Sequence, residues 1–403
     1  MHPEFLSFLA ANGVDPQEYI YETPIPRYIR LNPRKDAQPT VAALSAALKA
    51  PLSAVPWFPS FYRLDPDVRV GSSAPYKSAE IYGTDVASGV AVHALGVEPN
   101  DHVLDLCAAP GMKLCLVADL QAGGSGTCTG VDVSLDRMRV ARNVVRKYGA
   151  QNARLYVADG TTFDVRPPGR LLQAEAVDGE AEDDLLERSP AESEENSTPD
   201  FDLFAESIED DDDGETAYVS AVPSKEPLPG HPAPPKTKLF HASRLLRHLP
   251  PSPSSLYDKV LVDAECTHDG SIAHLLKYDR LGWATFSAKF LDPGRLANLH
   301  SLQLALLSNG FRLCKPGGTV VYATCSFTTA QNEDIVRDFM ATMPDGGVRL
   351  DKIDPVDERH PFPVAKSLKA LYPDVPGIEL CLRFSPVASQ TSGLFIAKFS
   401  KLR

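Results

Sequence analysis

The sequence predicts an α/β protein built on a mostly parallel, doubly wound sheet, and three observations lead to this prediction. First, β-branched runs alternate with stretches that have the apolar spacing of helices. Second, the runs at 103–107, 257–263 and 319–323 each break directly into a loop. Third, two further runs end in an acid, Asp132 and Asp159. Because the carboxyl ends of parallel strands share one edge of a sheet, these loops and acids should surround one crevice.

Length and composition set the outer limits. With 403 residues, 43% of them hydrophobic and 23% charged, the chain has the composition of a globular protein with room for two or three domains. No apolar run reaches the length of a membrane span, so no membrane partner is expected. The seven cysteines include no CxxC pair, which indicates neither a disulfide framework nor a metal site.

Free thiols and the lack of a signal peptide predict an intracellular protein. Residues 1–20 contain three acids and no arginine, which argues against a transit peptide. We therefore expect the cytoplasm or the nucleus, with an organelle not excluded, and a monomer.

The first half of the sheet follows from the region 103–158. In chain order, the predicted elements are a strand at 103–107, a helix at 111–121, a strand at 128–133, a helix at 134–148 and a strand at 154–158. Ser134 can cap the second helix, and Gly149 can end it. Met138, Ala141 and Val145 give that helix an apolar face.

The second half of the sheet follows from the region 257–399. The predicted elements are a strand at 257–263, a long helix across 296–307, a strand at 319–323, a helix through 335–339 and a strand at 393–399. Thr328 and Gln331 have the spacing of a capping box for the last helix. The final strand is expected to form an antiparallel edge of the sheet.

Two regions lie outside this alternation. Residues 1–90 contain short strand-like segments at 28–32 and 57–62 around a helical stretch at 38–50, which predicts a small α+β module before a domain at 91–403. Residues 166–236 read as an acidic and proline-rich insertion that is predicted to be disordered.

The insertion also hides the charge of the rest of the chain. Residues 170–215 carry 19 Asp and Glu against two Arg, a local charge of −17. Since the whole chain carries −13, the remainder carries +4, which is compatible with a nucleic-acid partner without requiring one. A solvated insertion is favoured over a role of this segment in controlling access of RNA.

The loop after the first strand and the acids after the next two predict a nucleotide site. Asp132 lies 27 positions past Asp105 and suits a carboxylate that binds ribose hydroxyls. Asp159 can accept a hydrogen bond from an adenine amino group. The loop contains no GxGxxG, so nicotinamide binding is not indicated. The alternative is that both acids only stabilise their loops.

Two cysteines face this loop from the later strands. Cys266 comes shortly after Asp263, at the end of the strand at 257–263, and Cys325 lies 59 positions after Cys266, beyond the strand at 319–323. Two thiols and an acid beside a nucleotide site predict nucleophilic chemistry on a base or a carbonyl. The alternative for Cys325 is a buried, inert thiol, and the other five cysteines are expected to be core or loop residues.

These motifs together resemble the Sun/Fmu (Nop/Sun) family of RNA (cytosine-5) methyltransferases, which use S-adenosylmethionine. The resemblance covers most of the chain outside the insertion. It rests on the segments 85–88, 104–113, 132–137, 159–160, 263–268, 322–326 with 332–333, 30–32 and 393–398, which occur in the family's order.

The resemblance implies a fold and a reaction. The fold would be a Rossmann-like class I methyltransferase sheet with a small N-terminal α+β module that binds RNA. The reaction would be methylation of C5 of a cytosine, in tRNA first and in rRNA second. The cofactor-binding residues would be Cys107, Ala108, Ala109, Pro110, Gly111, Met112, Lys113, Asp132, Arg137, Asp159 and Asp263.

The resemblance also implies the catalytic roles. Cys325 would add to C6 of the base, because C5 alone is too weak a nucleophile to take a methyl group. Asp263 would bind the N3/N4 edge of the flipped base. Cys266 would help to release the product, and Lys113 would orient Asp263 or stabilise charge in the crevice.

The chain departs from the family pattern beside Cys266. The family reads Asp-Ala-Pro-Cys-Ser-Gly, whereas this chain has Glu265 in place of the proline and His268 in place of the glycine. A carboxylate at Glu265 is expected to raise the pKa of Cys266 and slow product release. His268 and Asp269 could form a proton relay, but a pair that shapes the loop is favoured. Met112 and Gln331 are lesser departures.

Two alternatives stay open. One is an RNA-binding assembly factor with the same fold and weak or no turnover, for which Glu265 is the evidence. The other is a methyltransferase that acts on DNA or protein. The family's DNA-acting analogues place the nucleophile in the proline-cysteine loop, and here that loop lacks its proline.

Overall fold

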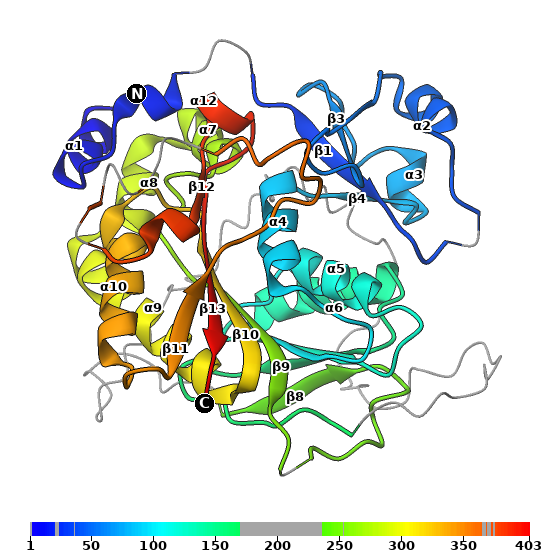
Figure 1. The fold of residues 1–403 in the computed structure, drawn as a ribbon. Coiled ribbons are helices and arrows are strands. Elements are labelled where there is room, and N and C mark those ends of the chain that lie inside the picture. Colours follow the sequence, from blue (N-terminus) through cyan, green and yellow to red (C-terminus); the bar gives the residue numbers. More distant parts are fainter. Residues whose placement is uncertain are drawn as a thin grey trace, which may run out of the picture.

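The structure is a computed structural model of the chain, drawn in Figure 1. It describes residues 2–20, 24–35, 37–169, 236–252, 254–364, 368, 372–373 and 375–403. Most of the predicted disordered insertion, residues 170–235, lies outside these described residues.

A nine-stranded mixed sheet forms the centre of the molecule. Its strands lie in the order β11-β13-β10-β9-β5-β6-β7-β8, with β12 also paired to β13. Five of them run parallel: β5 His102–Asp105, β6 Thr127–Asp132, β7 Ala153–Val157, β9 Tyr257–Asp263 and β10 Cys314–Thr324. The predicted Rossmann-like class I methyltransferase fold is thereby confirmed.

The order of the parallel strands creates a switch point between β5 and β9. From β5 the chain moves outward to β6 and β7, and it then returns to the other side of β5 to form β9 and β10. In such sheets the loops at the carboxyl ends of the two central strands separate and leave a crevice between them. The loops that follow Asp105 and Asp263 lie at this place.

Helices cover both faces of the sheet (Figure 1). On one face lie α4 Val86–Leu95, α5 Met112–Leu120 and α6 Leu135–Lys147, and on the other lie α9 Pro293–Leu313 and α10 Glu333–Thr342. A buried apolar cluster fills each interface. The predicted cap of α6 is confirmed, because the Ser134 side chain accepts the Arg137 amide and Gly149 follows at φ 68°.

Two predictions about the end of the chain are wrong in detail. The final strand, β13 Leu394–Lys401, is antiparallel but is not an edge, since β11 Val348–Asp351 and β12 Leu382–Phe384 also pair with it. Thr328 and Gln331 form no capping box. The Gln331 amide instead donates to the Thr328 hydroxyl at 2.7 Å, and α10 begins later, at Glu333.

A second, antiparallel sheet lies over α5 and α6. Its order is β2-β3-β1-β4, formed by Ser53–Ala54, Phe61–Leu64, Arg27–Leu31 and Ile81–Gly83, with α2 Val41–Leu48 and α3 Ala74–Lys77 beside it. Arg30 of β1 reaches Asp119 of α5 at 2.7 Å, and both side chains are buried. The ring of Tyr82 stacks on Tyr148 at 3.9 Å.

The first helix packs elsewhere. Phe5 of α1 Pro3–Ala11 contacts Trp283 and Phe286 of α8 Trp283–Phe290, and α7 Ile272–Leu281 belongs to the same apolar cluster. Figure 1 shows α1 at the far side of the molecule from the small sheet. The division at residue 90, and RNA binding by the residues before it, stay predictions.

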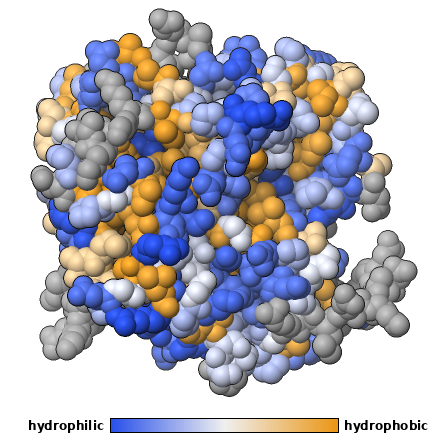
Figure 2. Space-filling view, viewed as in Figure 1, coloured by the Kyte–Doolittle hydropathy of each residue, from blue (hydrophilic) through white to orange (hydrophobic). Residues whose placement is uncertain are grey.

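The surface in Figure 2 is mostly hydrophilic, with apolar residues in patches between the polar ones. Among the helices of the described residues, none combines the length and the apolar character needed to cross a membrane.

Candidate active site

The loop at 107–111 is held against the end of β6. The Ala108 amide donates to the Val131 carbonyl at 2.8 Å. Gly130 of β6 allows this approach, because a Cβ there would lie 2.8 Å from the Ala108 side chain. Gly111 then starts α5 at φ 102°, a conformation that favours glycine. The predicted residues Cys107, Pro110 and Met112 thus lie on one turn over the crevice.

Lys113 and Asp263 link the two central loops. The Lys113 ammonium donates to Asp263 at 2.7 Å, and both side chains are largely buried. Burial alone lowers the pKa of Lys113, but the carboxylates of Asp263 and Asp105 outweigh it and leave this pKa above its usual value. Lys113 therefore remains charged and holds the Asp263 carboxylate by a hydrogen bond, and the catalytic roles of both residues stay predictions.

Asp132, the predicted ribose-binding acid, contacts the start of the helix that follows it, α6. Asp132 accepts the Ser134 amide at 3.0 Å and lies 3.3 Å from the guanidinium of Arg137. Arg137 also donates to the Ala109 carbonyl at 2.8 Å, so it bridges Asp132 and the loop after β5. Asp159 accepts the backbone amide of Thr161 at 2.9 Å. Both acids stabilise loops, and their roles toward a cofactor stay predictions.

Asp105 is a further acid of this site, and the sequence did not indicate its role. It is buried at the end of β5, and burial together with the nearby carboxylates of Asp263 and Asp132 raises its pKa to about 7. Lys113 opposes this rise. Three carboxylates thus share the positive charges of Lys113 and Arg137. A ligand that carries positive charge fits such a site.

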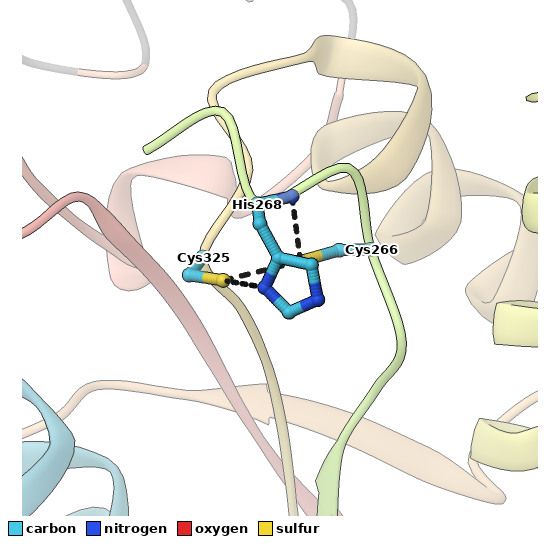
Figure 3. A group of neighbouring side chains, drawn as sticks. All are labelled: Cys266, His268 and Cys325. Carbon is cyan, nitrogen blue, oxygen red and sulfur yellow. Dashed lines mark hydrogen bonds between the residues drawn. The ribbon is translucent and has the colours of Figure 1, made fainter. Parts of the chain in front are cut away.

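The two cysteines lie side by side on the loops after two neighbouring strands (Figure 3). The sulfurs of Cys266 and Cys325 lie 3.2 Å apart, on loops that follow β9 and β10. The Nδ1 atom of His268 lies 3.1 Å from the Cys325 sulfur, and the His268 amide donates to Cys266 at 3.4 Å. Two thiols and an imidazole therefore share protons within one small cluster.

The pKa values of the two thiols move in opposite directions. Burial raises the pKa of Cys266, but the hydrogen bond from Cys325 and the charge and hydrogen bonds of His268 outweigh it, so this pKa lies well below its usual value. The hydrogen bond to Cys266, and then burial, raise the pKa of Cys325 well above its usual value. Because the sulfurs share a proton, the pair loses its first proton easily and its second with difficulty.

The loop that carries Cys266 is held by α9. Arg295 donates to the Glu265 carboxylate at 2.8 Å and to the Cys266 carbonyl at 2.9 Å. Gln303 donates to the Glu265 carbonyl at 2.7 Å. Arg295 is almost fully buried, so its charge needs the carboxylate at position 265.

The loop that carries Cys325 is held by side chains from α10 and β12. Asn332 donates to the Ser326 carbonyl at 2.8 Å, and Thr324 donates to Asn332 at 2.5 Å. Arg383 donates to the Phe327 carbonyl at 2.7 Å and forms a bidentate pair with the buried Glu333. Both flanks of Cys325 are therefore fixed.

One expectation about the departures from the family pattern is wrong. Glu265 does not raise the pKa of Cys266, because Arg295 takes up its charge and the pKa of Cys266 is lowered. Asp269 accepts the Thr267 hydroxyl and the Phe327 amide, and the loop-shaping pair of His268 with Asp269 stays a prediction. The ring of His268 contacts the Cys325 sulfur. The replacement of the family's glycine by His268 was the feature of the sequence that could have indicated this contact.

Most of the remaining cysteines lie inside the fold, as expected. Cys115, Cys128, Cys314 and Cys381 are buried, and Cys107 is partly exposed. Burial raises the pKa of Cys107 well above its usual value, and the charge of Asp132 adds to the effect.

Comparison with known proteins gives consistent matches. Residues 92–178 and 241–400 match the family described as 16S rRNA methyltransferase RsmB/F. The chain is 22% identical over 385 residues to the ribosomal RNA small subunit methyltransferase F of Serratia proteamaculans, covering 94% of this chain and 58% of the relative. It is 28% identical over 272 residues to the 5-cytosine rRNA methyltransferase NSUN4 of Bos taurus, covering 68% and 47%. The chain thus spans about half the length of these curated relatives.

Solved structures share the fold. A methyltransferase homolog from Pyrococcus horikoshii aligns over the full length of both chains with a TM-score of 0.58 and 20% identity. NSun6 from Pyrococcus horikoshii, solved with SFG, aligns over 95% of this chain and 92% of its own with a TM-score of 0.56 and 14% identity.

Proposed function

Because the chain belongs to the RsmB/F family of 16S rRNA methyltransferases, we propose that it methylates C5 of a cytosine in RNA, with S-adenosylmethionine as the methyl donor. The observation that carries this proposal is the pair of thiols, 3.2 Å apart, at the switch point of the sheet beside the Lys113–Asp263 pair. One thiol is enough for addition to the base, and the second thiol is available to assist release of the methylated product.

The residues divide the reaction as follows. The Cys325 thiolate adds to C6, and the electrons of the C5–C6 double bond move to C5, which becomes nucleophilic. N3 takes up a proton from solvent as the adduct forms, and Asp263, oriented by Lys113, accepts hydrogen bonds from the N4 amino group and from this N3–H. When bound, S-adenosylmethionine supplies the methyl group that C5 takes up. The C5 proton and the N3 proton are then lost to solvent, the double bond reforms, and the Cys325 thiolate leaves, a release that Cys266 assists.

The cofactor would lie on the loop 107–113. Asp132 and Asp159 would contact its nucleoside part, and the excess of carboxylates around Asp105 would favour its positive charge. The solved NSun6 structure with SFG, an S-adenosylmethionine analogue, supports this choice of cofactor for the fold.

We propose ribosomal RNA as the first substrate to test and transfer RNA as the second. This reverses the preference that the sequence suggested, because the relatives compared above are named as rRNA methyltransferases. The alternative of an inactive assembly factor rested on Glu265. Since Arg295 pairs with that carboxylate and the two cysteines still face each other, the active enzyme is the better supported function.

Transfer of a labelled methyl group tests the proposal. The purified chain should label RNA, and bisulfite sequencing should place the mark on cytosine, whereas DNA and protein from the same cells should stay unlabelled. Cys325→Ala should abolish the label. Label in DNA or protein alone, or none in any substrate with the folded chain, would contradict it.

A further inference from the structure

His268 occupies a position where a side chain has an energetic cost. Its backbone adopts φ 55°, in the left-handed region, where a residue other than glycine pays roughly 1–2 kcal/mol. The motif that this loop resembles has glycine at the same place, which would adopt this conformation without that cost. An imidazole held in a strained conformation against reactive groups points to a function of the ring.

The ring is fixed in contact with the thiols. Its Nδ1 atom lies 3.1 Å from the Cys325 sulfur, while Phe290 of α8 packs edge-on at 5.5 Å. The sulfurs and the ring nitrogen all lie within 4.8 Å of one another. At these distances a proton can pass between sulfur and nitrogen without any movement of the chain.

We propose that His268 accepts the proton that the Cys266–Cys325 pair loses, and that its imidazolium then holds the thiolate that attacks the base. The S–H bond breaks with its electron pair left on sulfur, and an N–H bond forms at Nδ1. The remaining thiol proton passes between the two sulfurs, so the charge is available at Cys325. After the thiolate leaves the product, the imidazolium still holds the proton, and the cluster is ready again.

The surroundings explain why a positive group is needed here. The carboxylates of Asp263 and Asp269 disfavour a thiolate at Cys325, and Lys113 favours it. Two other titratable residues also lie against the cluster: His274 of α7, whose ring lies 5.3 Å from His268, and Tyr322 of β10, whose pKa is raised by burial and by the charge of Cys266. From α8, Phe290 contributes an apolar ring. An imidazolium at 3.1 Å can offset the two carboxylates because it lies in direct contact with sulfur.

This role of His268 rests on the proposed function, but the experiment that tests it needs neither RNA nor cofactor. The full-length chain is treated with iodoacetamide across a pH series, and the alkylation of Cys325 and Cys266 is followed by peptide mass spectrometry. The parent should react at pH values below those at which an ordinary thiol, with a pKa near 8.5, becomes reactive. Cys107, outside the cluster, serves as the internal control.

Two variants separate the proton acceptor from a structural residue. His268→Asn tolerates the left-handed backbone and can form hydrogen bonds but cannot take the proton, and His268→Gly restores the glycine of the resembled motif. In both, alkylation of the pair at pH 7 should fall roughly tenfold or more, as a rise of one unit in the pKa would cause, and the profile should shift to higher pH. The melting temperature should be unchanged or higher.

An unchanged alkylation profile in both variants would overturn the proposal, whatever their activity on RNA. So would a fall in alkylation that is matched by loss of folded protein. Conversely, a shifted profile in a chain that fails to methylate RNA would leave this role standing and contradict the proposed function alone.

Discussion

The guanidinium of Arg295 lies 2.8 Å from the carboxylate of Glu265, and the same nitrogen donates to the carbonyl of Cys266 at 2.9 Å. The residue that replaces the family's proline is therefore part of the support for the cysteine loop. A proline would restrict this loop through its fixed φ, whereas here an ion pair with α9 provides the restraint.

Replacing Glu265 should destabilise the fold because it leaves Arg295 as a buried charge. We expect Glu265→Pro to lower the free energy of unfolding by about 3 kcal/mol, the scale for removing one partner of a buried pair. Denaturant unfolding measures this loss. In the double variant Glu265→Pro with Arg295→Met, at least about 1 kcal/mol should return as coupling between the positions. The single variant Arg295→Met completes the cycle, and a loss in the double variant equal to the sum of the two single losses would show that the pair contributes nothing.

Binding of S-adenosylmethionine should depend on pH through Asp105. Its pKa is raised to about 7, so the carboxyl is protonated below this pH and ionised above it. A cationic ligand favours the ionised form, and its affinity should therefore rise with pH up to about 7 and level off above. Calorimetry at pH 6 should show proton release on binding. Asp105→Asn should remove this pH dependence, and an unchanged profile in that variant would exclude Asp105 as its cause.

Asp132 should contribute to cofactor affinity. Asp132→Ala should weaken binding of S-adenosylmethionine by roughly 1–3 kcal/mol, the scale for losing hydrogen bonds to a charged group. Because the Ser134 side chain caps α6 two positions after Asp132, Ser134→Ala is the matched control. This control removes the cap of α6 and should cost about 1 kcal/mol of stability without the loss in affinity. Equal dissociation constants for parent and Asp132→Ala would remove Asp132 from the cofactor site.

The sequence predicts the central part of the fold well because that part is locally encoded. The parallel strands are apolar runs of ordinary length, and the α6 cap depends on Ser134 and its near neighbours. The position of β13 was missed because β11 and β12 are short strands whose pairing to it is decided by tertiary contacts.

The site, too, could be predicted where it depends on local sequence and was missed where it depends on tertiary contacts. The sequence could predict that four residues lie near the same edge of the sheet, because each ends or follows a predicted parallel strand: Lys113, Asp263, Cys266 and Cys325. The contact of His268 with Cys325 spans 57 positions and depends on a left-handed backbone at His268, which the pattern of residue types does not encode. The pairing of Arg295 with Glu265 depends likewise on how α9 lies on the sheet.

The insertion should be dispensable for folding. The strands that flank it, β7 and β8 Lys238–Ala242, pair directly as antiparallel neighbours, so residues 170–235 only need to connect them. Deleting 170–235 with a short Gly/Ser linker should leave the melting temperature nearly unchanged. If its charge competes with RNA, deletion should also tighten RNA binding, most at low salt. A large drop in melting temperature would show that this segment supports the core.

The most direct test of the account is the covalent bond between Cys325 and the base. RNA and S-adenosylmethionine are incubated with Cys266→Ala and with Cys325→Ala, and the products are separated on a denaturing gel. Cys266→Ala should accumulate a covalent RNA–protein band because the group that assists release is gone, whereas Cys325→Ala should form no band and transfer no methyl group. A band from Cys325→Ala, or its absence from Cys266→Ala while methyl transfer continues, would contradict the assignment of the two thiols.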